Sequence, residues 1–300
     1  MQDMKELEVN TADDVNQPPI EAWADVGELR VRYLDWGGDG PPVLALHGLA
    51  SSAHWYDLVA PLLRENYRVI APDQRGHGQT TQASNGYDWQ SLASDAVGLM
   101  DHLGISQAAV FGHSWGGNVA INVAASFPER VSALVMIDGG FFGARARSRP
   151  TLEEFKTRAA PRDVSGTRQE FLARIRGQLV LCWNDDVERI VQTMVYEDEA
   201  GQMHDILRPD NHTQVMEAMW GQPASDTWPN ISARTLIVAA GPTPERAGSE
   251  FARRRQESVE SASQGIKNNR VYWVPETIHD IGFHKPEELA KVIGEFLAEG

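Results

Sequence analysis

Short apolar runs alternate with longer stretches of helical spacing along most of this chain. Residues 43–46, 108–111 and 133–137 are continuously apolar, as strands buried on both faces of a sheet should be. Residues 90–103 instead repeat apolar side chains at helical spacing. Further strands are predicted at 29–33, 67–71, 234–239 and 271–274, and a final helix at 286–298. This alternation predicts an α/β fold, with a doubly wound, mostly parallel sheet that helices cover on both faces.

The alternation stops between residues 143 and 228, where helix-like segments follow one another without a convincing buried strand. We interpret 143–228 as a helical cap, inserted into a core domain that is made of residues 25–142 and 229–300. Residues 1–24 are acidic and polar and include two adjacent prolines. We therefore expect a loose N-terminal segment there.

The charge balance disfavours nucleic acid as a partner. A net charge of −15 opposes binding to a phosphate backbone, which needs clustered Lys and Arg. The one basic cluster, Arg253-Arg254-Arg255, lies between Glu250 and Glu257. We interpret this cluster as a solvated helix face.

Composition also bears on location and cofactors. No run of about 18 uncharged apolar residues occurs, so no membrane span is predicted. The first residues lack the basic and apolar regions of a signal peptide. The single cysteine, Cys182, has no partner for an internal disulfide and no Cys/His cluster that could hold zinc. These features predict a cytoplasmic protein with no metal, no cofactor and no membrane partner.

A serine between two glycines, Gly112-His113-Ser114-Trp115-Gly116, stands where a predicted strand ends and a helix begins. Such a sharp turn strains the backbone of the middle residue and exposes its hydroxyl at the top of the sheet. The flanking glycines remove side chains that would clash there. We therefore interpret Ser114 as a nucleophile.

A nucleophilic serine needs a base, an acid that orients the base, and amide donors for the developing oxyanion. His47-Gly48-Leu49 directly follows the strand at 43–46, where a turn can aim the Leu49 amide at the site. The second donor would be the amide of Trp115, the residue after the nucleophile. We assign His47 a structural role.

Four segments resemble, in their order along the chain, the motifs of the α/β-hydrolase family: 47–49, 73–78, 112–117 and 279–288. The resemblance covers nearly all of the chain from about residue 25. In this family the histidine before the last helix is the base, and the matching position is His279, with His284 as the competing choice. The resemblance also implies that 73–78 is a structural loop, although its Asp73 and His77 look catalytic in isolation.

The acid departs from the family pattern. Much of the family carries it as G-x-x-D after the strand that matches 235–239, but here residues 241–246 contain no aspartate. Two candidates remain: Glu245 in that loop, and Asp138 after the strand at 133–137. Some family members, including certain dehalogenases and a resorcylic lactone hydrolase, resemble this chain in placing the acid after the latter strand. We favour Asp138.

These residues predict a serine hydrolase that cleaves small or medium carboxylic esters through an acyl-enzyme, without a cofactor. Lactone, amide or C–C bond hydrolysis would use the same residues. Epoxide hydrolases and haloalkane dehalogenases are disfavoured, because those family members carry aspartate at the position of Ser114. A ligand-binding protein on a hydrolase scaffold is the alternative from another class, and the missing G-x-x-D acid favours it.

Apolar side chains of the predicted cap would suit a pocket for an apolar group, although packing within the cap explains them equally well: Trp183, Met194, Met203, Met216, Met219 and Trp220. Another four apolar side chains lie nearer the predicted site: Leu49, Trp115, Phe141 and Phe142.

Overall fold

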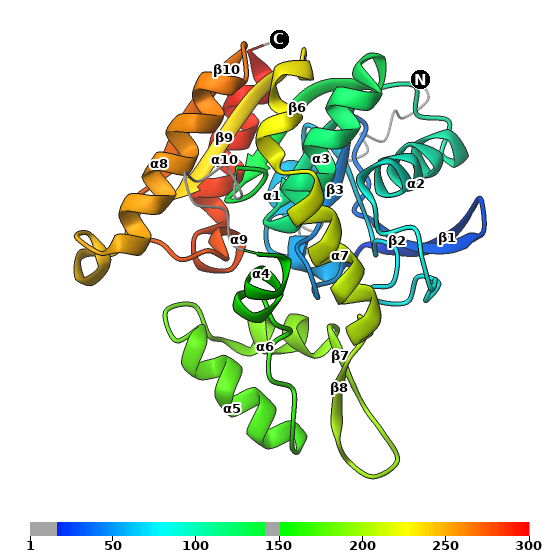
Figure 1. The fold of residues 1–300 in the computed structure, drawn as a ribbon. Coiled ribbons are helices and arrows are strands. Elements are labelled where there is room, and N and C mark those ends of the chain that lie inside the picture. Colours follow the sequence, from blue (N-terminus) through cyan, green and yellow to red (C-terminus); the bar gives the residue numbers. More distant parts are fainter. Residues whose placement is uncertain (1–16, 142–150, 300) are drawn as a thin grey trace, which may run out of the picture.

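One eight-stranded sheet forms the centre of the protein in a computed structural model that describes residues 17–141 and 151–299 (Figure 1). The strand order is β1-β2-β4-β3-β5-β6-β9-β10. The strands are β1 (Ile20–Val26), β2 (Leu29–Asp35), β3 (Pro42–Leu46), β4 (Arg68–Pro72), β5 (Ala108–His113), β6 (Val131–Ile137), β9 (Arg234–Ala240) and β10 (Asn269–Val274). β2 is antiparallel to both β1 and β4, and all other neighbours are parallel. The predicted mostly parallel, doubly wound sheet is confirmed.

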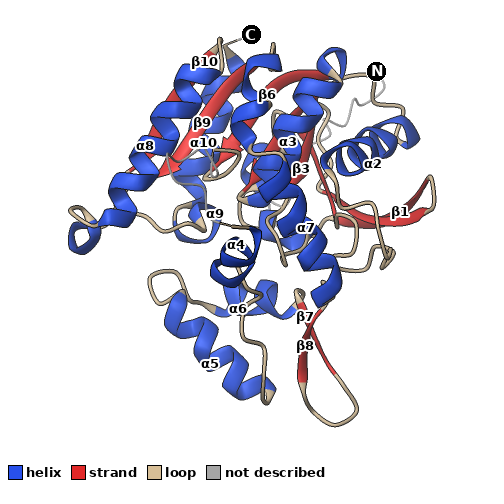
Figure 2. Ribbon diagram, viewed as in Figure 1, coloured by secondary structure: helices blue, strands red, loops and turns tan. Residues whose placement is uncertain are grey.

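Helices cover both faces of this sheet (Figure 2). Apolar residues of α2 (Trp89–His102), α3 (Trp115–Ser126) and α8 (Glu250–Gly265) belong to one hydrophobic core. Those of α1 (Ala60–Leu63), α9 (Ile281–His284) and α10 (Pro286–Ala298) belong to a second. Along β3, Leu44 and Leu46 join the first core, whereas Val43 and Ala45 join the second. Period-two alternation between two buried faces explains why this strand is apolar throughout.

The segment between β6 and β9 contains α4 (Leu152–Arg158), α5 (Arg168–Gln178), α6 (Asp185–Gln192) and α7 (Pro209–Gly221). It also contains a short antiparallel hairpin, β7 (Val195–Glu197) with β8 (Met203–Asp205). Figure 1 shows α4, α5, α6 and the hairpin grouped below the sheet. Capping boxes start α4 at Thr151 and α5 at Thr167, each closed by a glutamate three residues later. Helices therefore make up most of this segment, and its role as a cap stays a prediction.

The predicted loose N-terminal segment is wrong for residues 20–24, which belong to β1. This strand pairs with β2 along its whole length. It lies at the edge of the sheet, and Ile20 and Trp23 are 68% and 38% exposed. An edge strand with one solvated face carries no continuous apolar run, so the sequence pattern missed it. Residues 1–16 and Phe142 lie outside the described residues.

Short 3-10 turns complete the described chain: Ala53–Tyr56, Pro128–Arg130, Ala224–Asp226, Trp228–Asn230 and Pro244–Arg246. Within residues 17–141 and 151–299, no helix combines the length and the apolarity that crossing a bilayer requires.

Candidate active site

Ser114 occupies a strained turn between β5 and α3. Its backbone has φ 53° and ψ −120°, in the region that favours glycine. A Cβ at Gly112 would overlap the carbonyl oxygen of Gly116, and a Cβ at Gly116 would overlap that of Leu46. The two glycines therefore permit the close passage of α3 against the sheet, and they leave Ser114 in a tight turn between the strand and the helix.

Three side chains from separate loops meet at this turn. Ser114 Oγ lies 2.9 Å from His279 Nε2, and His279 Nδ1 lies 2.6 Å from Asp138 Oδ2. An ionised carboxylate can only accept hydrogen bonds, so the proton of the neutral imidazole is on Nδ1. Nε2 is then left to accept the proton of Ser114. This is the arrangement of a nucleophile, a base and an orienting acid.

The Asp138 carboxylate is fully buried and has several partners. Its Oδ1 accepts the amide of Ala240 at 3.0 Å, and Arg255 Nη2 lies 3.2 Å from its Oδ2. Burial raises the pKa of Asp138, but the hydrogen bond and charge of His279, with the charge of Arg255, bring it below its ordinary value. Burial lowers the pKa of His279, and Asp138 outweighs that effect and raises it. The pair therefore favours an ionised acid beside a more basic histidine.

The competing candidates point elsewhere. Glu245 is exposed in the 3-10 turn after β9, and the described residues show no contact between it and His279. His284 contacts Thr277 Oγ1 through Nδ1 at 3.0 Å. Of the two proposed acids, Asp138 is the one hydrogen-bonded to His279.

Arg255 corrects the prediction of a solvated basic helix face. Arg253 and Arg254 do face solvent and pair with acids on their own helix. Arg255 is only 8% exposed and reaches Asp138 instead. The signal was available, because Arg255 shares the buried stripe of α8 with Val259 and Ala262.

Two buried histidines fix the loop that carries the Leu49 amide. His47 Nε2 accepts the amide of Gln74 at 3.0 Å, so the proton is on Nδ1, which donates to the Gly48 carbonyl at 2.8 Å. The Gly48 carbonyl and the Leu49 N–H belong to one peptide unit and point in opposite directions. His47 thus turns the Leu49 N–H away from itself. Burial lowers the pKa of His47 to about 4, so its ring is neutral.

His77 holds the next peptide unit of this loop. Its Nδ1 donates to the Arg75 carbonyl at 2.9 Å, and its Nε2 accepts the amide of Ala50 at 3.1 Å. Burial lowers the pKa of His77 to about 3, so it too is neutral. Ala50 has φ 53°, a left-handed conformation that such contacts must stabilise in a residue other than glycine.

The inserted segment holds the opposite side of the same loop. Arg162, between α4 and α5, donates from Nη2 to the Ala50 carbonyl at 2.9 Å and pairs through Nε with Asp205 at 2.7 Å. A second tie joins Thr193 Oγ1 to Ser52 Oγ at 2.6 Å. The conformation of the Leu49 loop therefore depends on the insert as well as on the core.

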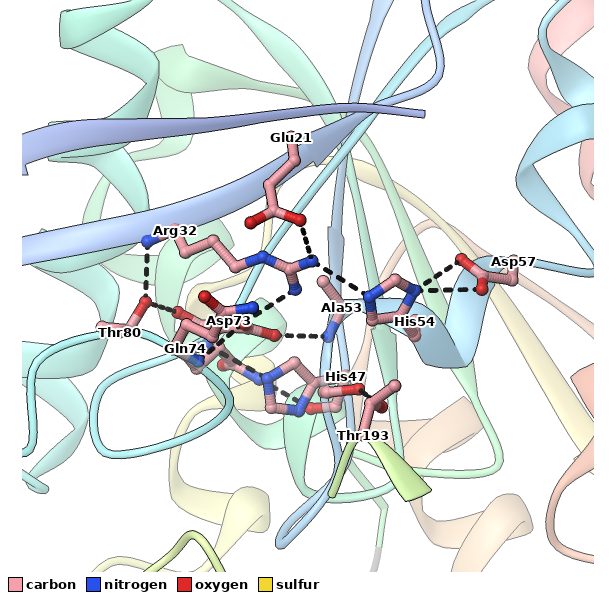
Figure 3. A network of polar contacts seen from close by, with 12 residues as sticks. Glu21, Arg32, His47, Ala53, His54, Asp57, Asp73, Gln74, Thr80 and Thr193 are labelled. Atoms are coloured by element: carbon pink, nitrogen blue, oxygen red, sulfur yellow. Dashed lines mark hydrogen bonds and ion pairs between the residues drawn. The ribbon is translucent and has the colours of Figure 1, made fainter. Parts of the chain in front are cut away.

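Figure 3 shows the polar network behind the loop. Asp73 is fully buried, accepts the amide of Ala53 at 2.8 Å and contacts Arg32 at 3.0 Å. Among the described residues it contacts neither Ser114 nor His279. Its contacts tie the loop to the sheet, in agreement with the structural role that the resemblance implied.

The loop that carries His279 is held in a similar way. His113 Nε2 lies 3.2 Å from the carbonyl oxygen of His279, and Trp55 Nε1 donates to Asp280 Oδ1 at 3.0 Å. The rings of His113 and Trp55 stack with their centroids 4.0 Å apart. Sequence reasoning assigned neither side chain a role.

Two cavities meet at Ser114, and the walls of both also include Leu49 and Arg162. The smaller has a volume of about 200 Å³ and extends past His279, with Met194 of the insert on its far side.

The larger cavity has a volume of about 330 Å³ and lies between α3 and α7. Trp115 borders it, so both predicted oxyanion donors lie in its wall together with Ser114. Trp115 is the first residue of α3, where an amide has no partner within the helix. Met216 and Met219 line its insert side, whereas Phe141 lines neither cavity.

Within the part of the chain that the structure describes, no cluster of three His, Cys, Asp or Glu side chains is arranged to hold a metal ion. The contacts among Ser114, His279 and Asp138 suit proton transfer and nucleophilic attack by the Ser114 hydroxyl.

The family model for the alpha/beta hydrolase fold matches residues 41–240. The chain therefore belongs to the alpha/beta hydrolase fold family.

Relatives within this family differ in activity. A soluble epoxide hydrolase from Corynebacterium sp. (strain C12) is 36% identical over 115 residues, 38% of this chain and 40% of that protein. A non-heme chloroperoxidase from Streptomyces lividans is 43% identical over 108 residues, 35% of this chain and 39% of that protein. The chain aligns with only about 35 to 43% of the length of the curated relatives that it matches first.

Solved structures are similar over nearly the whole chain. E-2-(acetamidomethylene)succinate hydrolase matches with a TM-score of 0.77 at 22% identity, over 93% of this chain and 99% of that one. The enol-lactonase from Burkholderia xenovorans LB400 matches with a TM-score of 0.66 at 19% identity, over 92% and 100%. Similarity at this level of identity supports the fold.

Proposed function

We propose that this protein is a serine hydrolase that cleaves carboxylic esters, including lactones, through an acyl-enzyme. The observation that carries the proposal is the hydrogen-bonded series from Ser114 Oγ through His279 to Asp138. A serine hydroxyl becomes an effective nucleophile only when a positioned base takes its proton.

In the first half of the reaction, Ser114 Oγ attacks the carbonyl carbon while His279 Nε2 takes the hydroxyl proton. The carbonyl oxygen becomes an oxyanion, which the amides of Leu49 and Trp115 stabilise. The C–O bond to the alcohol then breaks, and His279 returns the proton to that alcohol. Asp138 stabilises the imidazolium between these two transfers.

In the second half, His279 takes a proton from water, and the resulting nucleophile attacks the acyl-enzyme carbonyl. This attack forms a tetrahedral intermediate. When it collapses, the carboxylic acid is released and His279 returns the proton to Ser114 Oγ. In a lactone, the alcohol and the acid stay joined as one hydroxy acid.

The nucleophile distinguishes this proposal from the activity of the epoxide hydrolase and dehalogenase relatives. Attack of a serine oxygen on an epoxide or haloalkane carbon would form an ether, which water does not hydrolyse under mild conditions. Attack on a carbonyl forms an ester, which the same His279 can help water to hydrolyse. Ser114 therefore favours carbonyl substrates.

The test is reaction with a fluorophosphonate probe and hydrolysis of p-nitrophenyl esters. We expect stoichiometric labelling of the wild type and burst release of p-nitrophenol, and we expect Ser114→Ala to abolish both. The surface variant Ser258→Ala is the matched control and should behave as the wild type. An unlabelled wild type that hydrolyses no ester or lactone would overturn the proposal and favour a ligand-binding protein on a hydrolase scaffold.

A further inference from the structure

Two polar side chains line the larger cavity without a hydrogen-bond partner among residues 17–141 and 151–299. His212 on α7 is 7% exposed, and Asn118 on α3 is 3% exposed. Among the described residues, neither the His212 ring nor the Asn118 amide group makes a hydrogen bond. Buried polar groups nearly always have a partner, because burying them unpaired costs free energy. The polar atoms of His212 and Asn118 are not among the fully enclosed unpaired atoms of the described residues, so they are open to the cavity, where a ligand beside Ser114 can supply their partners.

The position of His212 is well fixed relative to the nucleophile. Asn211 donates to the Ala83 carbonyl at 3.1 Å, and Gln214 donates to the Ser84 carbonyl at 2.9 Å. These contacts attach α7 to the core on both sides of His212. Because α7 is anchored in this way, a loosely held helix does not explain why the His212 ring lacks a hydrogen-bond partner among the described residues.

The other walls of the cavity are mostly apolar. Met216 and Met219 follow His212 on one face of α7, at the spacing of one and two helical turns. Ala159 and Leu49 add apolar surface. A fitting ligand would thus be apolar along most of its length and polar at one point.

The polar point suits an uncharged group. Burial lowers the pKa of His212, so its ring is neutral and offers one donor and one acceptor. The side-chain amide of Asn118 offers both a donor and an acceptor and carries no charge. Arg162 borders the cavity, but it pairs with Asp205 and also donates to the Ala50 carbonyl. A ketone, hydroxyl or amide would satisfy these partners without burying a new charge.

The two cavities divide the substrate between them. His279 must protonate the departing alcohol, and His279 borders the smaller cavity and not the larger. The alcohol part would therefore extend into the smaller cavity, which leaves the larger one to the acyl part.

We propose that the larger cavity binds the acyl group and that His212 and Asn118 recognise a neutral oxygen- or nitrogen-bearing group on its chain. The preferred substrate class is then an ester or lactone of an oxo-, hydroxy- or amido-substituted acid. This inference rests on the proposed ester hydrolysis.

The test compares kcat/KM for p-nitrophenyl hexanoate with that for its 3-oxo, 4-oxo and 5-oxo analogues. For the wild type we expect at least one oxo ester to exceed hexanoate by about tenfold, the gain typical of one good hydrogen bond. His212→Leu should bring this ratio close to one, and His212→Gln should restore part of it. Thr213→Val, on the exposed side of the same helix, is the matched control and should keep the ratio of the wild type.

Each outcome separates the two proposals. A ratio near one for every oxo ester, or a ratio that His212→Leu leaves unchanged, overturns the recognition proposal while ester hydrolysis stands. Absence of any hydrolysis together with absence of fluorophosphonate labelling overturns the proposed function itself. If His212→Leu does not fold, Asn118→Leu and His212→Gln carry the same comparison.

Discussion

Buried histidines near Ser114 differ in their surroundings, and His47, His77 and His212 show the contrast most clearly. His47 and His77, beneath the Leu49 loop, are hydrogen-bonded at both ring nitrogens. His212, in the wall that the insert contributes, makes no ring hydrogen bond among the described residues. Burial lowers the pKa of all three, so all are neutral. They differ in whether the protein or a ligand completes their hydrogen bonds.

This difference distinguishes residues that would orient the oxyanion donors from residues that would recognise the substrate. Donors aimed at an oxyanion are most effective when the fold has already oriented them, because no reorganisation is then needed as charge develops. The protein completes that part by itself. Polar groups that select a substrate must stay open to it, because discrimination comes from leaving them unpaired with the wrong substrate. The following variants test this division, from the largest expected effect to the smallest.

Asp138→Asn should cause the largest loss on the chemistry side. An amide can donate to His279 Nδ1, which would move the ring proton to Nε2 and prevent that atom from accepting the Ser114 proton. We expect kcat for p-nitrophenyl esters to fall by roughly 10⁴-fold with little change in KM. Steady-state kinetics with burst-phase measurement would check this.

Glu245→Gln is the matched control for this loss. The exposed side chain of Glu245 does not contact His279, so its amide variant should keep the activity of the wild type. The opposite result, with a severe loss in Glu245→Gln and a mild one in Asp138→Asn, would reassign the acid and undo the comparison.

The sequence supports some parts of this site better than others, for physical reasons. Ser114 and the expected aim of the Leu49 amide follow from local turns, whose chemistry neighbouring residues display. The assignment of His279 depends on family resemblance, and the sequence leaves both Asp138 and Glu245 as candidates for the acid. Which carboxylate pairs with His279 depends on the tertiary structure, because the two residues lie far apart in the sequence.

Two residues illustrate what local patterns miss. Helical spacing places Arg255 on the buried stripe of α8, but its contact with Asp138 depends on how that helix packs against the sheet. His212 has no motif around it, because an unsatisfied hydrogen bond is visible only when every neighbour is known. β1 was missed for the related reason that pairing at a sheet edge, and not an apolar run, defines it.

Arg162→Met should cause an intermediate loss, because Arg162 is one of two links between the insert and the Leu49 loop that the site shows. His77 binds the amide of Ala50, and Arg162 binds its carbonyl. Without Arg162 only the amide side is held, so the neighbouring Leu49 amide becomes less well oriented. We expect kcat to fall roughly 10- to 100-fold, the cost of a small misplacement of a reacting group, with a smaller change in KM. The kcat and KM values for a simple alkyl ester would separate the two effects.

Arg168→Met is the control, since Arg168 is an exposed arginine of the insert that pairs with Glu197. It should leave both constants unchanged. If Arg162→Met instead raises KM and leaves kcat intact, Arg162 acts on substrate binding in the larger cavity, and the Leu49 loop keeps its orientation without the Arg162 hydrogen bond.

The pH dependence gives the smallest effect and the sharpest test of the charge arrangement. His279 must be neutral to accept the Ser114 proton, so kcat/KM should rise with pH through the pKa of His279, which Asp138 holds above its ordinary value against the effect of burial. The charge of Arg255 lowers this pKa. Arg255→Met should therefore move the acid limb to higher pH and reduce activity more at acidic than at neutral pH.

Arg254→Met, one residue away and paired with Glu250 on the exposed face of α8, should leave the acid limb in place. Equal losses for Arg255→Met at every pH would mean that Arg255 acts by packing alone. A limb that moves to lower pH would mean that lost orientation of Asp138 outweighs the lost positive charge. Either result would contradict the expectation that the charge of Arg255 tunes the pKa of His279 while the orientation of Asp138 stays fixed.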